Sequence, residues 1–473
     1  MAHSSRPGSS SRSKRTDGAT RSKRTGETTN REFGEKKNPF RHEERGARGA
    51  NAPLHRPVAH AAVAALYSTM VDGRYADKVI EYTFKNEKNM GGRDRRMFAE
   101  MVYDIVRWWR RYGHAVGEDT EVFMADPKLL DKKQIWKWLA AYLVERSVKL
   151  GQPPSLPSWE EFSGVSATAI ANALSEEKLE RAITQSIPNW LDQLGEKELG
   201  GKWSTVLKGS NQQAPVILRA NTLKCTREQL IARLKEESEI VTVPAHRTDF
   251  GVMLPERKNV FTTDAFKDGW FEVQDGASQQ VAAFVDAQPG ERVIDACAGA
   301  GGKTLAIGAT MKNKGRLLSL DVQEKKLQEL RKRVARAGID TCEAKLIDSA
   351  KVIKRLENTA DKVLLDVPCS GLGVLRRNPD TKWKLKFEEL KRLRELQAQI
   401  LDDYTSMAKV GGRVVYATCS CLPSENQDQI KGFLERSRDA SGKAKFELVS
   451  ERTFWPGEDG YDGFYAAVLK RLS

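Results

Sequence analysis

Residues 293–308 read VIDACAGAGGKTLAIG, and this stretch decides the fold class. An apolar run ends in Asp295 and a glycine-rich turn follows. Lys303 and Thr304 then open a segment in which apolar residues recur at helical spacing. The pattern predicts a strand, a tight turn and a helix. Such a turn can hold the phosphates of a nucleoside triphosphate, or an adenosyl cofactor at the first strand-to-helix connection of a Rossmann-like sheet.

The positions of the glycines separate these two possibilities. A phosphate-binding loop of the form G-x-x-x-x-G-K-[ST] would place its first glycine at position 297, but that residue is Cys297. The opening glycine is what lets the backbone amides bend around the phosphates. Gly299, Gly301 and Gly302 do not fit G-x-G-x-x-G either. The turn therefore suits a cofactor that lies against the backbone and carries no triphosphate.

Acidic residues end the next two predicted strands. Residues 316–322 read RLLSLDV and end at Asp321, and a helical pattern closed by Gly338 follows. The third strand, AKLIDSA, ends at Asp348. An acid at the end of the second strand can accept hydrogen bonds from ribose hydroxyls, whereas any one such acid can also be a helix N-cap. With Asp295, three acids on successive strands favour an adenosyl pocket, and a nicotinamide dinucleotide stays open at this point.

Two cysteines follow the next two predicted strands. The fourth strand ends at Asp366 in VLLDVPCSG, which places Cys369 where many methyltransferases of exocyclic amines carry an aromatic residue. The stretch GGRVVYATCSC places Cys419 at the end of the next strand. Successive strand ends of an open sheet share one crevice, so Cys369 and Cys419 are expected to face each other there.

A thiol at this position points to chemistry on a pyrimidine. Carbon 5 of a pyrimidine is a weak nucleophile until a thiolate adds to carbon 6, and an acid near ring N3, the role expected of Asp366, stabilises the adduct. The target base must leave its stack to be reached. A cysteine after a strand can instead be a small buried hydrophobe, which we expect for Cys225 and Cys342. A zinc site lacks ordinary ligand spacing around Cys421, and a C-x-x-C redox motif is absent.

The composition of the chain limits the classes of protein to which it can belong. The chain has 473 residues, a net charge of +14 and six cysteines. No apolar run is long enough for a membrane span and no signal peptide is recognisable, so we expect a cytoplasmic protein with reduced thiols. Residues 1–50 hold 13 Lys/Arg against 6 Asp/Glu and repeat RSKRT. This segment is predicted to be a disordered arm that contacts nucleic-acid phosphates, or else a solubilising tail.

The pattern along the chain predicts an α/β protein with four parts. These are a disordered basic tail at 1–55, a helical domain at 56–190, a small mixed α+β RNA-binding subdomain at 191–285 and a Rossmann-like domain at 286–473 with a mostly parallel sheet. In the helical part, the tryptophans of RWWRRY at 107–112 are expected in the core and its arginines on a solvated face, although the cluster could also clamp RNA.

With the glycine turn, the strand-end acids and the two cysteines described above, the chain resembles the bacterial Sun/Fmu (RsmB-type) family of RNA 5-methylcytosine methyltransferases. The similar stretches span about 190 to 473 and read LRANTLK, VQDGASQQVA, DACAGAGGKT, LLDVPCSGLGVLRRNPDTKW, YATCS and DGYDGFYAAVLKR. Residues 56–190 are only loosely similar to the NusB-type helical domain of some members. The family's Ala-Pro-Gly-Gly-Lys turn is replaced here by Gly299-Ala300-Gly301-Gly302-Lys303, and the missing proline should loosen the turn.

The resemblance implies a class I methyltransferase that uses S-adenosylmethionine, has no metal, and acts on RNA, with ribosomal RNA favoured. It implies a cofactor pocket lined by Cys297, Ala298, Gly299, Ala300, Gly301, Gly302, Lys303, Asp321, Asp348 and Asp366. It also implies Cys419 as the nucleophile and Cys369 as a helper in product release, whereas DNA enzymes of this chemistry use the Pro-Cys thiol. Lys303 would face Asp366, and Arg376 and Arg377 would steer phosphates or lie in a solvated loop.

Three other functions are compatible with parts of this pattern. The chain could be an RNA-binding ribosome-assembly factor with an inactive methyltransferase fold, although the intact cysteines and acids argue against it. It could be a tRNA cytosine methyltransferase. An exocyclic-amine methyltransferase is disfavoured because no aromatic residue follows Pro368.

Overall fold

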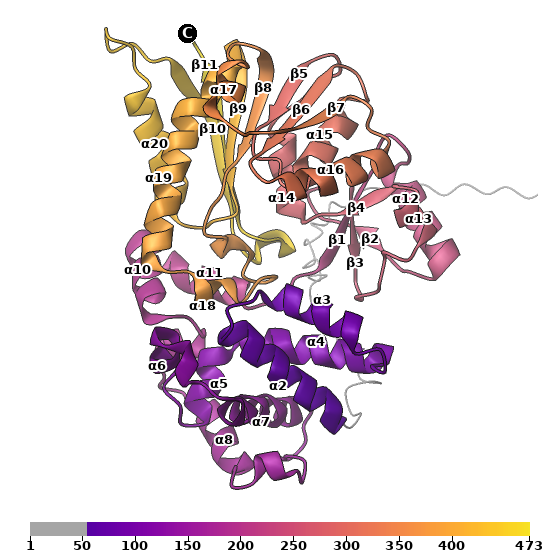
Figure 1. The fold of residues 1–473 in the computed structure, drawn as a ribbon, viewed down its shortest axis with the longest axis vertical. Coiled ribbons are helices and arrows are strands. Elements are labelled where there is room, and N and C mark those ends of the chain that lie inside the picture. Colours follow the sequence, from indigo (N-terminus) through magenta and orange to yellow (C-terminus); the bar gives the residue numbers. More distant parts are fainter. Residues whose placement is uncertain (1–53) are drawn as a thin grey trace, which may run out of the picture. The chain divides into compact units, whose positions relative to one another are not determined.

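Helices build the first part of the chain (Figure 1). The computed structural model describes residues 54–473, so nearly all of the predicted basic tail lies outside the described residues. The helices are α2 (Arg56–Met70), α3 (Ala76–Asn86), α4 (Gly92–Arg107), α5 (Trp109–Ala115), α6 (Thr120–Ala125), α7 (Lys132–Lys149), α8 (Ala167–Leu174), α9 (Arg181–Thr184), α10 (Asn189–Leu199) and α11 (Lys202–Ser210). The likeness of this part to NusB stays a prediction.

The tryptophan-arginine cluster lies inside this helical part. Trp109 stacks on Trp138 with ring centroids 4.5 Å apart, and both rings are buried as expected. The expectation of solvated arginines was wrong for Arg107 and Arg110, which are also buried. Arg110 donates to the carbonyl of Ile187 and pairs with an acid on α6, so it joins helices and is not free to bind RNA.

A small antiparallel sheet follows, in the order β2-β3-β1-β4. Its elements are β1 (Val216–Ala220), α12 (Arg227–Ser238), β2 (Val243–Pro244), β3 (Gly251–Leu254), α13 (Asp264–Lys267) and β4 (Phe271–Val273). Thr226 caps α12 because its hydroxyl accepts from the Gln229 amide while the Gln229 side chain reaches back.

The large sheet has the order β10-β11-β9-β8-β5-β6-β7. Strand β11 runs in the opposite direction to all the others. Its elements begin with α14 (Gly276–Ala283), β5 (Arg292–Asp295), α15 (Gly302–Thr310), β6 (Arg316–Asp321), α16 (Glu324–Ala337), β7 (Cys342–Leu346), α17 (Ala350–Lys354) and β8 (Ala360–Asp366). They continue with α18 (Thr381–Lys384), α19 (Phe387–Tyr404), β9 (Ala408–Thr418), α20 (Gln427–Arg436), β10 (Phe446–Phe454) and β11 (Phe464–Arg471).

This sheet confirms the predicted α/β class with a mostly parallel sheet. Helices α14, α15 and α16 cover one face, and α17, α19 and α20 cover the other (Figure 1). The strands at its centre are therefore apolar on both sides, with Ile294 and Val363 on one face and Val293 and Leu364 on the other, all fully buried. Because β5, β8 and β9 are parallel neighbours, the residues that follow them meet at one edge.

Residues 54–473 hold neither a membrane-spanning helix nor a grouping of metal ligands. No helix described there is long and apolar enough to cross a membrane. Within the same residues, no group of three or more histidine, cysteine or acidic side chains has the arrangement of a metal site.

Candidate active site

The glycine turn between β5 and α15 forms one wall of the site. Gly299 and Gly301 have φ of 54° and 89°, a backbone conformation that favours glycine. The Gly299 amide donates to Asp321 Oδ2 at 2.8 Å, which fixes the turn to the end of β6. A Cβ on Gly301 would lie 2.9 Å from Leu330, so that position has no room for a side chain.

Two arginines restrain the same turn through its carbonyls. Arg333 on α16 donates to the Ala300 carbonyl at 2.7 Å, and Arg219 on β1 donates to the Gly302 carbonyl at 2.9 Å. Ala300 stands at the position where the turn expected from the family resemblance has proline. The Arg333 contact supplies from another helix some of the restraint that a proline ring would give.

The turn offers room for a ligand that lies against its backbone. A Cβ on Gly299 or Gly302 would meet no other atom within 4 Å, so open space borders the turn at both glycines. Asp321 is buried, and its Oδ1 accepts from the Gln323 amide at 2.8 Å. Each carboxylate oxygen has a second acceptor site, so Asp321 can still accept a hydroxyl donor. These features fit an adenosyl cofactor.

Lys303 and Asp366 form an ion pair at the centre of the site. Lys303 Nζ lies 2.7 Å from Asp366 Oδ2 and 5.1 Å from the centre of the Phe464 ring. Burial lowers the pKa of Lys303, but the Asp366 carboxylate offsets this, and the pKa lies above its ordinary value. Lys303 is therefore a fixed cation beside an acid that remains partly exposed.

The two cysteines lie in contact. Cys369 Sγ and Cys419 Sγ are 3.3 Å apart as free thiols, and the Cys419 amide donates to Cys369 Sγ, also at 3.3 Å. The hydrogen bond to Cys419 and burial raise the pKa of the Cys369 thiol well above its usual value. Burial therefore favours the protonated form of Cys369, and either thiol of the pair can donate to the other.

The remaining predicted site residues, among those that the structure describes, form no hydrogen bond with the Lys303–Asp366 pair or with the two cysteines. Cys297 is half-buried, and its pKa is raised by burial and by nearby acids. Ala298 is buried, and its amide donates to the Leu320 carbonyl. Asp348 is exposed two residues beyond β7, and the hydroxyl of Ser349 donates to it. In the described part of the chain, no hydrogen bond joins Asp348 to Asp321 or Asp366.

One residue of the site was missed by sequence reasoning. Phe464 begins β11, far along the chain, and its ring lies under Lys303. Asp295 was expected as one of the strand-end acids of the adenosyl pocket, and it is buried and accepts from the Thr304 hydroxyl at 2.7 Å. Burial raises the pKa of Asp295 to about 7. Its apolar strand was the only sequence feature that pointed to this burial.

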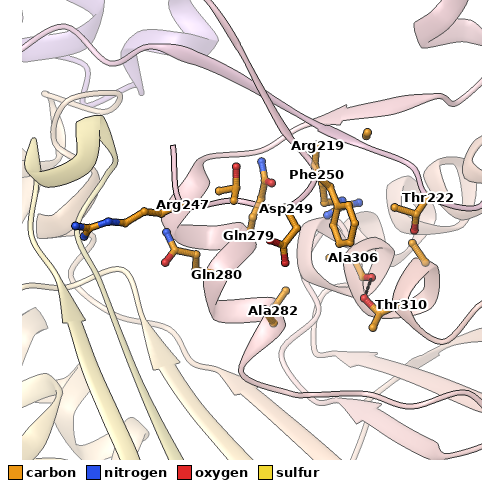
Figure 2. A pocket seen from close by; sticks show the side chains of 14 residues that line it. Arg219, Thr222, Arg247, Asp249, Phe250, Gln279, Gln280, Ala282, Ala306 and Thr310 are labelled. Atoms are coloured by element: carbon orange, nitrogen blue, oxygen red, sulfur yellow. Dashed lines mark hydrogen bonds between the residues drawn. The ribbon is translucent and has the colours of Figure 1, made fainter. Parts of the chain in front are cut away.

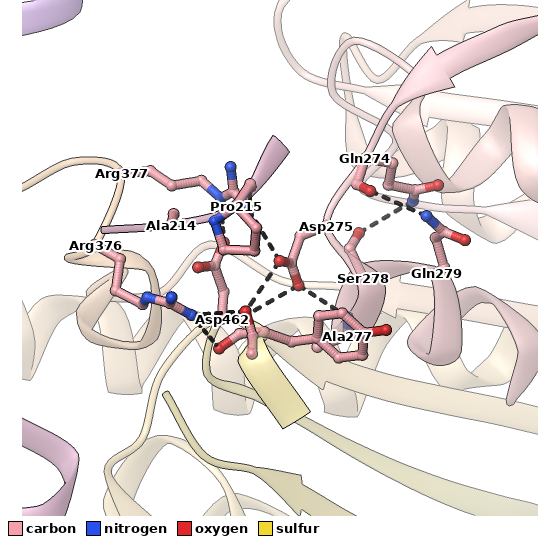
Figure 3. A network of polar contacts seen from close by, with 12 residues as sticks. Ala214, Pro215, Gln274, Asp275, Ala277, Ser278, Gln279, Arg376, Arg377 and Asp462 are labelled. Carbon is pink, nitrogen blue, oxygen red and sulfur yellow. Dashed lines mark hydrogen bonds and ion pairs between the residues drawn. The ribbon is translucent and has the colours of Figure 1, made fainter. Parts of the chain in front are cut away.

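Arg376 does not lie in a solvated loop, which corrects the expectation for that residue, whereas Arg377 is half-buried (Figure 3). Arg376 is buried and donates to the carbonyls of Gly460, Tyr461 and Gln213 at 2.8–2.9 Å. Arg377 bonds Asp462, and it reaches Asp275 at 3.0 Å. Both side chains therefore fix the loop after Cys369 to other parts of the chain.

A small pocket lies away from the cysteines, between the small sheet and helices α14 and α15 (Figure 2). Arg219, Phe250, Gln279 and Thr310 are among its lining residues, and its free volume is about 90 Å³. That is below the roughly 300 Å³ of a typical small-molecule site. We therefore place the candidate site at the cysteines and the glycine turn.

Comparisons with known proteins agree with this site. Residues 282–470 match the family described as 16S rRNA methyltransferase RsmB/F, and residues 187–260 match the ferredoxin-like domain of RsmF/B-like methyltransferases. The chain is 35% identical to ribosomal RNA small subunit methyltransferase B of Vibrio cholerae over 60% of its own length and 65% of that protein. It is 34% identical to the Shewanella oneidensis protein of the same name, over 62% of this chain and 68% of that one.

The alignments thus span about two thirds of the length of these curated relatives. Among solved structures, the crystal structure of PH0851 is similar with a TM-score of 0.71 and 25% identity. The similarity covers 89% of this chain and all of that one. The likeness therefore extends over the helical part as well as both sheets.

Proposed function

Because this chain belongs to the RsmB/F family of 16S rRNA methyltransferases, we propose that it transfers a methyl group from S-adenosylmethionine to carbon 5 of a cytosine in RNA. The observation that carries the proposal is the contact between Cys369 and Cys419, whose sulfurs are 3.3 Å apart beside Asp366 and Lys303. An aromatic residue in place of Cys369 would have supported an exocyclic amine as the target.

The cofactor would lie along the turn at 297–303. S-adenosylmethionine supplies an electrophilic methyl group when it is bound. The open space at Gly299 and Gly302 gives its adenosyl part access to the backbone. Asp321 would accept from the ribose hydroxyls, and Asp348 and Asp366 would complete the wall of the pocket.

Cys419 would make the covalent bond to the base. Its thiolate adds to carbon 6, which pushes electron density toward carbon 5 and ring N3. Asp366, when protonated, would donate a hydrogen bond to N3, and Lys303 contacts the other side of that carboxyl group at 2.7 Å. Carbon 5 then takes the methyl group, loses its proton to a base, and the carbon 6–sulfur bond breaks to return Cys419 as a thiolate.

The division of labour between the cysteines is supported by their hydrogen bond. Cys369 keeps its proton because its pKa lies well above the usual value, through the bond to Cys419 and through burial. Cys419 is therefore the sulfur proposed to carry the negative charge and to act as the nucleophile. Cys369 remains within reach of the departing sulfur and is proposed to assist release.

The proposed substrate is ribosomal RNA, as in the names of the curated relatives. The net charge of +14 suits a polyanionic partner. All six cysteines are free thiols, which supports the proposed cytoplasmic location.

The test uses tritium-labelled S-adenosylmethionine with the full chain. We expect label in ribosomal RNA of the small subunit, at a cytosine that bisulfite sequencing reports as protected only when the enzyme is active. Cys419→Ala should remove the label. Label in tRNA alone would show that the substrate is tRNA and not ribosomal RNA. RNA binding without any label would identify an inactive assembly factor instead.

A further inference from the structure

Each of the two cysteines is followed by a serine, and the proposed chemistry uses neither serine. Ser370 follows Cys369 and Ser420 follows Cys419. Both serines are buried, and their hydroxyl oxygens lie 3.2 Å apart. The pair of serines therefore lies directly behind the pair of sulfurs.

Glu425 binds both serines with one carboxylate. It is fully buried, and its Oε2 accepts from the hydroxyls of Ser370, at 2.5 Å, and Ser420. Its Oε1 accepts from the Ser370 amide at 2.8 Å. A hydroxyl has only one proton, so both protons go to Glu425 and the contact between the serines is a consequence of the shared acceptor.

The carboxylate is also held from a third direction. Gln397 on α19 donates to Glu425 Oε1 at 3.0 Å and to the Pro368 carbonyl at 2.9 Å. Four donor contacts thus converge on one buried side chain, and Glu425 accepts in each of them. Both oxygens of Glu425 are thus hydrogen-bonded, and a buried carboxylate held from several directions has little freedom to move.

The next residue holds the other side of the Cys419 segment. Asn426 accepts from the Thr418 hydroxyl at 2.6 Å and donates to the Ser420 carbonyl at 3.1 Å. These bonds fix the Thr418–Ser420 backbone, but they do not reach the Cys369 loop. Among the side chains of residues 54–473, only that of Glu425 bonds the residues after both cysteines.

We propose that Glu425 is a positioning residue that holds the sulfurs of Cys369 and Cys419 in contact by tying together the serines that follow them. The clamp, defined as Glu425, Ser370 and Ser420, touches no reacting atom. Its effect is to keep the proton donor of one cysteine within reach of the sulfur of the other. The functional meaning of the clamp rests on the proposed cysteine chemistry, but its geometry can be tested without RNA.

The geometric test uses phenylarsine oxide, a trivalent arsenical that bonds two thiols lying side by side and releases water. The wild-type protein should retain one arsenical against excess monothiol, and Cys369→Ala should release it. Ser420→Ala removes the only bond between the carboxylate and the Cys419 segment. It should weaken retention by about tenfold or more, because chelation depends on the fixed spacing of the two thiols. Glu425→Ala should do the same where it folds.

Tyr416→Phe is the matched control. The Tyr416 hydroxyl donates to the backbone carbonyl of Glu425 at 2.7 Å, so this change removes a buried hydrogen bond at the same residue without touching the carboxylate. It should lower the thermal midpoint as much as Ser420→Ala does and leave arsenical retention near the wild-type value. Equal retention in Ser420→Ala and wild type, or equal losses in Ser420→Ala and Tyr416→Phe, would overturn the proposal.

Turnover gives the second readout. Ser420→Ala should lower kcat by up to about a hundredfold, since a misplacement near 1 Å has effects of that order. The KM for RNA should stay near its wild-type value. If the wild type retains the arsenical but methylates no RNA, the proposed function fails while the positioning role stands. If Ser420→Ala weakens retention but leaves kcat unchanged, the contact between the sulfurs is not needed for catalysis and the positioning role is overturned.

Discussion

At the scale of single residues, the site depends on protons held in place. Cys369 and Cys419 are thiols that share a hydrogen bond, and Lys303 is a cation paired with Asp366. Both arrangements follow from burial, because an unpaired charge in such a place would be costly. The chemistry proposed for the site therefore depends on which sulfur carries the negative charge. Substituting each cysteine in turn distinguishes the two assignments.

Cys369→Ala should accumulate a covalent complex with RNA. Cys419 can still add to carbon 6 and carbon 5 can still be methylated, but release lacks its helper. A slow band should survive denaturation on a gel, and the variant lacking both thiols should show none. If Cys419→Ala gives the band and Cys369→Ala does not, the roles are reversed, as in the DNA enzymes.

Asp321→Ala should weaken binding of S-adenosylmethionine by roughly thirty- to a hundredfold, which corresponds to about 2–3 kcal/mol. The change removes the acceptor for the ribose and also the bond to the Gly299 amide. Calorimetry measures the affinity directly. Asp348→Ala is the comparison, since Asp348 is exposed, and we expect a smaller loss there. An unchanged affinity in Asp321→Ala would mean that the pocket lies elsewhere.

At the scale of elements, the turn between β5 and α15 couples three parts of the fold. It is bonded by Asp321 at the end of β6, by Arg333 on α16 and by Arg219 on β1. The conformation of the turn requires positive φ at Gly299 and Gly301, but the two glycines have different surroundings. Stability and cofactor binding should therefore respond differently at the two positions.

Gly301→Ala should destabilise the protein by about 2–3 kcal/mol, because backbone strain adds to a clash with Leu330. Gly299→Ala should cost only about 1 kcal/mol, since its Cβ meets open space. That same Cβ would enter the space proposed for the cofactor, so Gly299→Ala should lose affinity for S-adenosylmethionine. Urea unfolding and calorimetry on both variants check the two effects, and equal stability losses would contradict the described turn.

At the scale of the whole molecule, the loop after Cys369 is tied to segments far away in the chain. Arg376 and Arg377 bond the segment at 213–215, the start of α14 and the loop before β11 (Figure 3). Arg107 on α4 donates to the Arg376 carbonyl at 3.0 Å, and Lys382 on α18 donates to the Arg107 carbonyl. The helical part is thus hydrogen-bonded to the loop that carries Cys369.

Arg376→Ala should destabilise the protein by about 3 kcal/mol, since three carbonyls lose a shared buried donor. Arg392→Ala is the control. Arg392 is an exposed partner of Glu389, and its loss should leave the stability close to that of the wild type. Urea unfolding compares the two, and similar small losses would show that the contact network contributes little.

Deletion of residues 1–50 should weaken RNA binding and flatten its dependence on salt, because the segment has a net charge of +7. The modified cytosine should stay the same, since charge alone contacts phosphates and does not read bases. Binding titrations at several salt concentrations and bisulfite sequencing are the two measurements. A new modified position would identify the segment as a specificity element.

The sequence alone determined the parallel core and the meeting of its strand ends. The acids and cysteines at 295, 321, 366, 369 and 419 follow apolar strands, and parallel neighbours bring their carboxyl ends to one edge whatever the side chains do. The glycine turn could be interpreted for a similar reason, because positive φ is a local property of glycine. These features depend on periodicity and backbone geometry within short stretches.

Only the tertiary structure decided how distant segments meet. The insertion of β11 between β9 and β10, the ring of Phe464 under Lys303, the burial of Arg376 and the serine bonds of Glu425 each join residues through packing. The local sequence of a loop arginine does not show whether its guanidinium donates to water or to three buried carbonyls. The outcome depends on whether the surrounding segments leave buried acceptors that need a donor, and that is a property of the assembled fold.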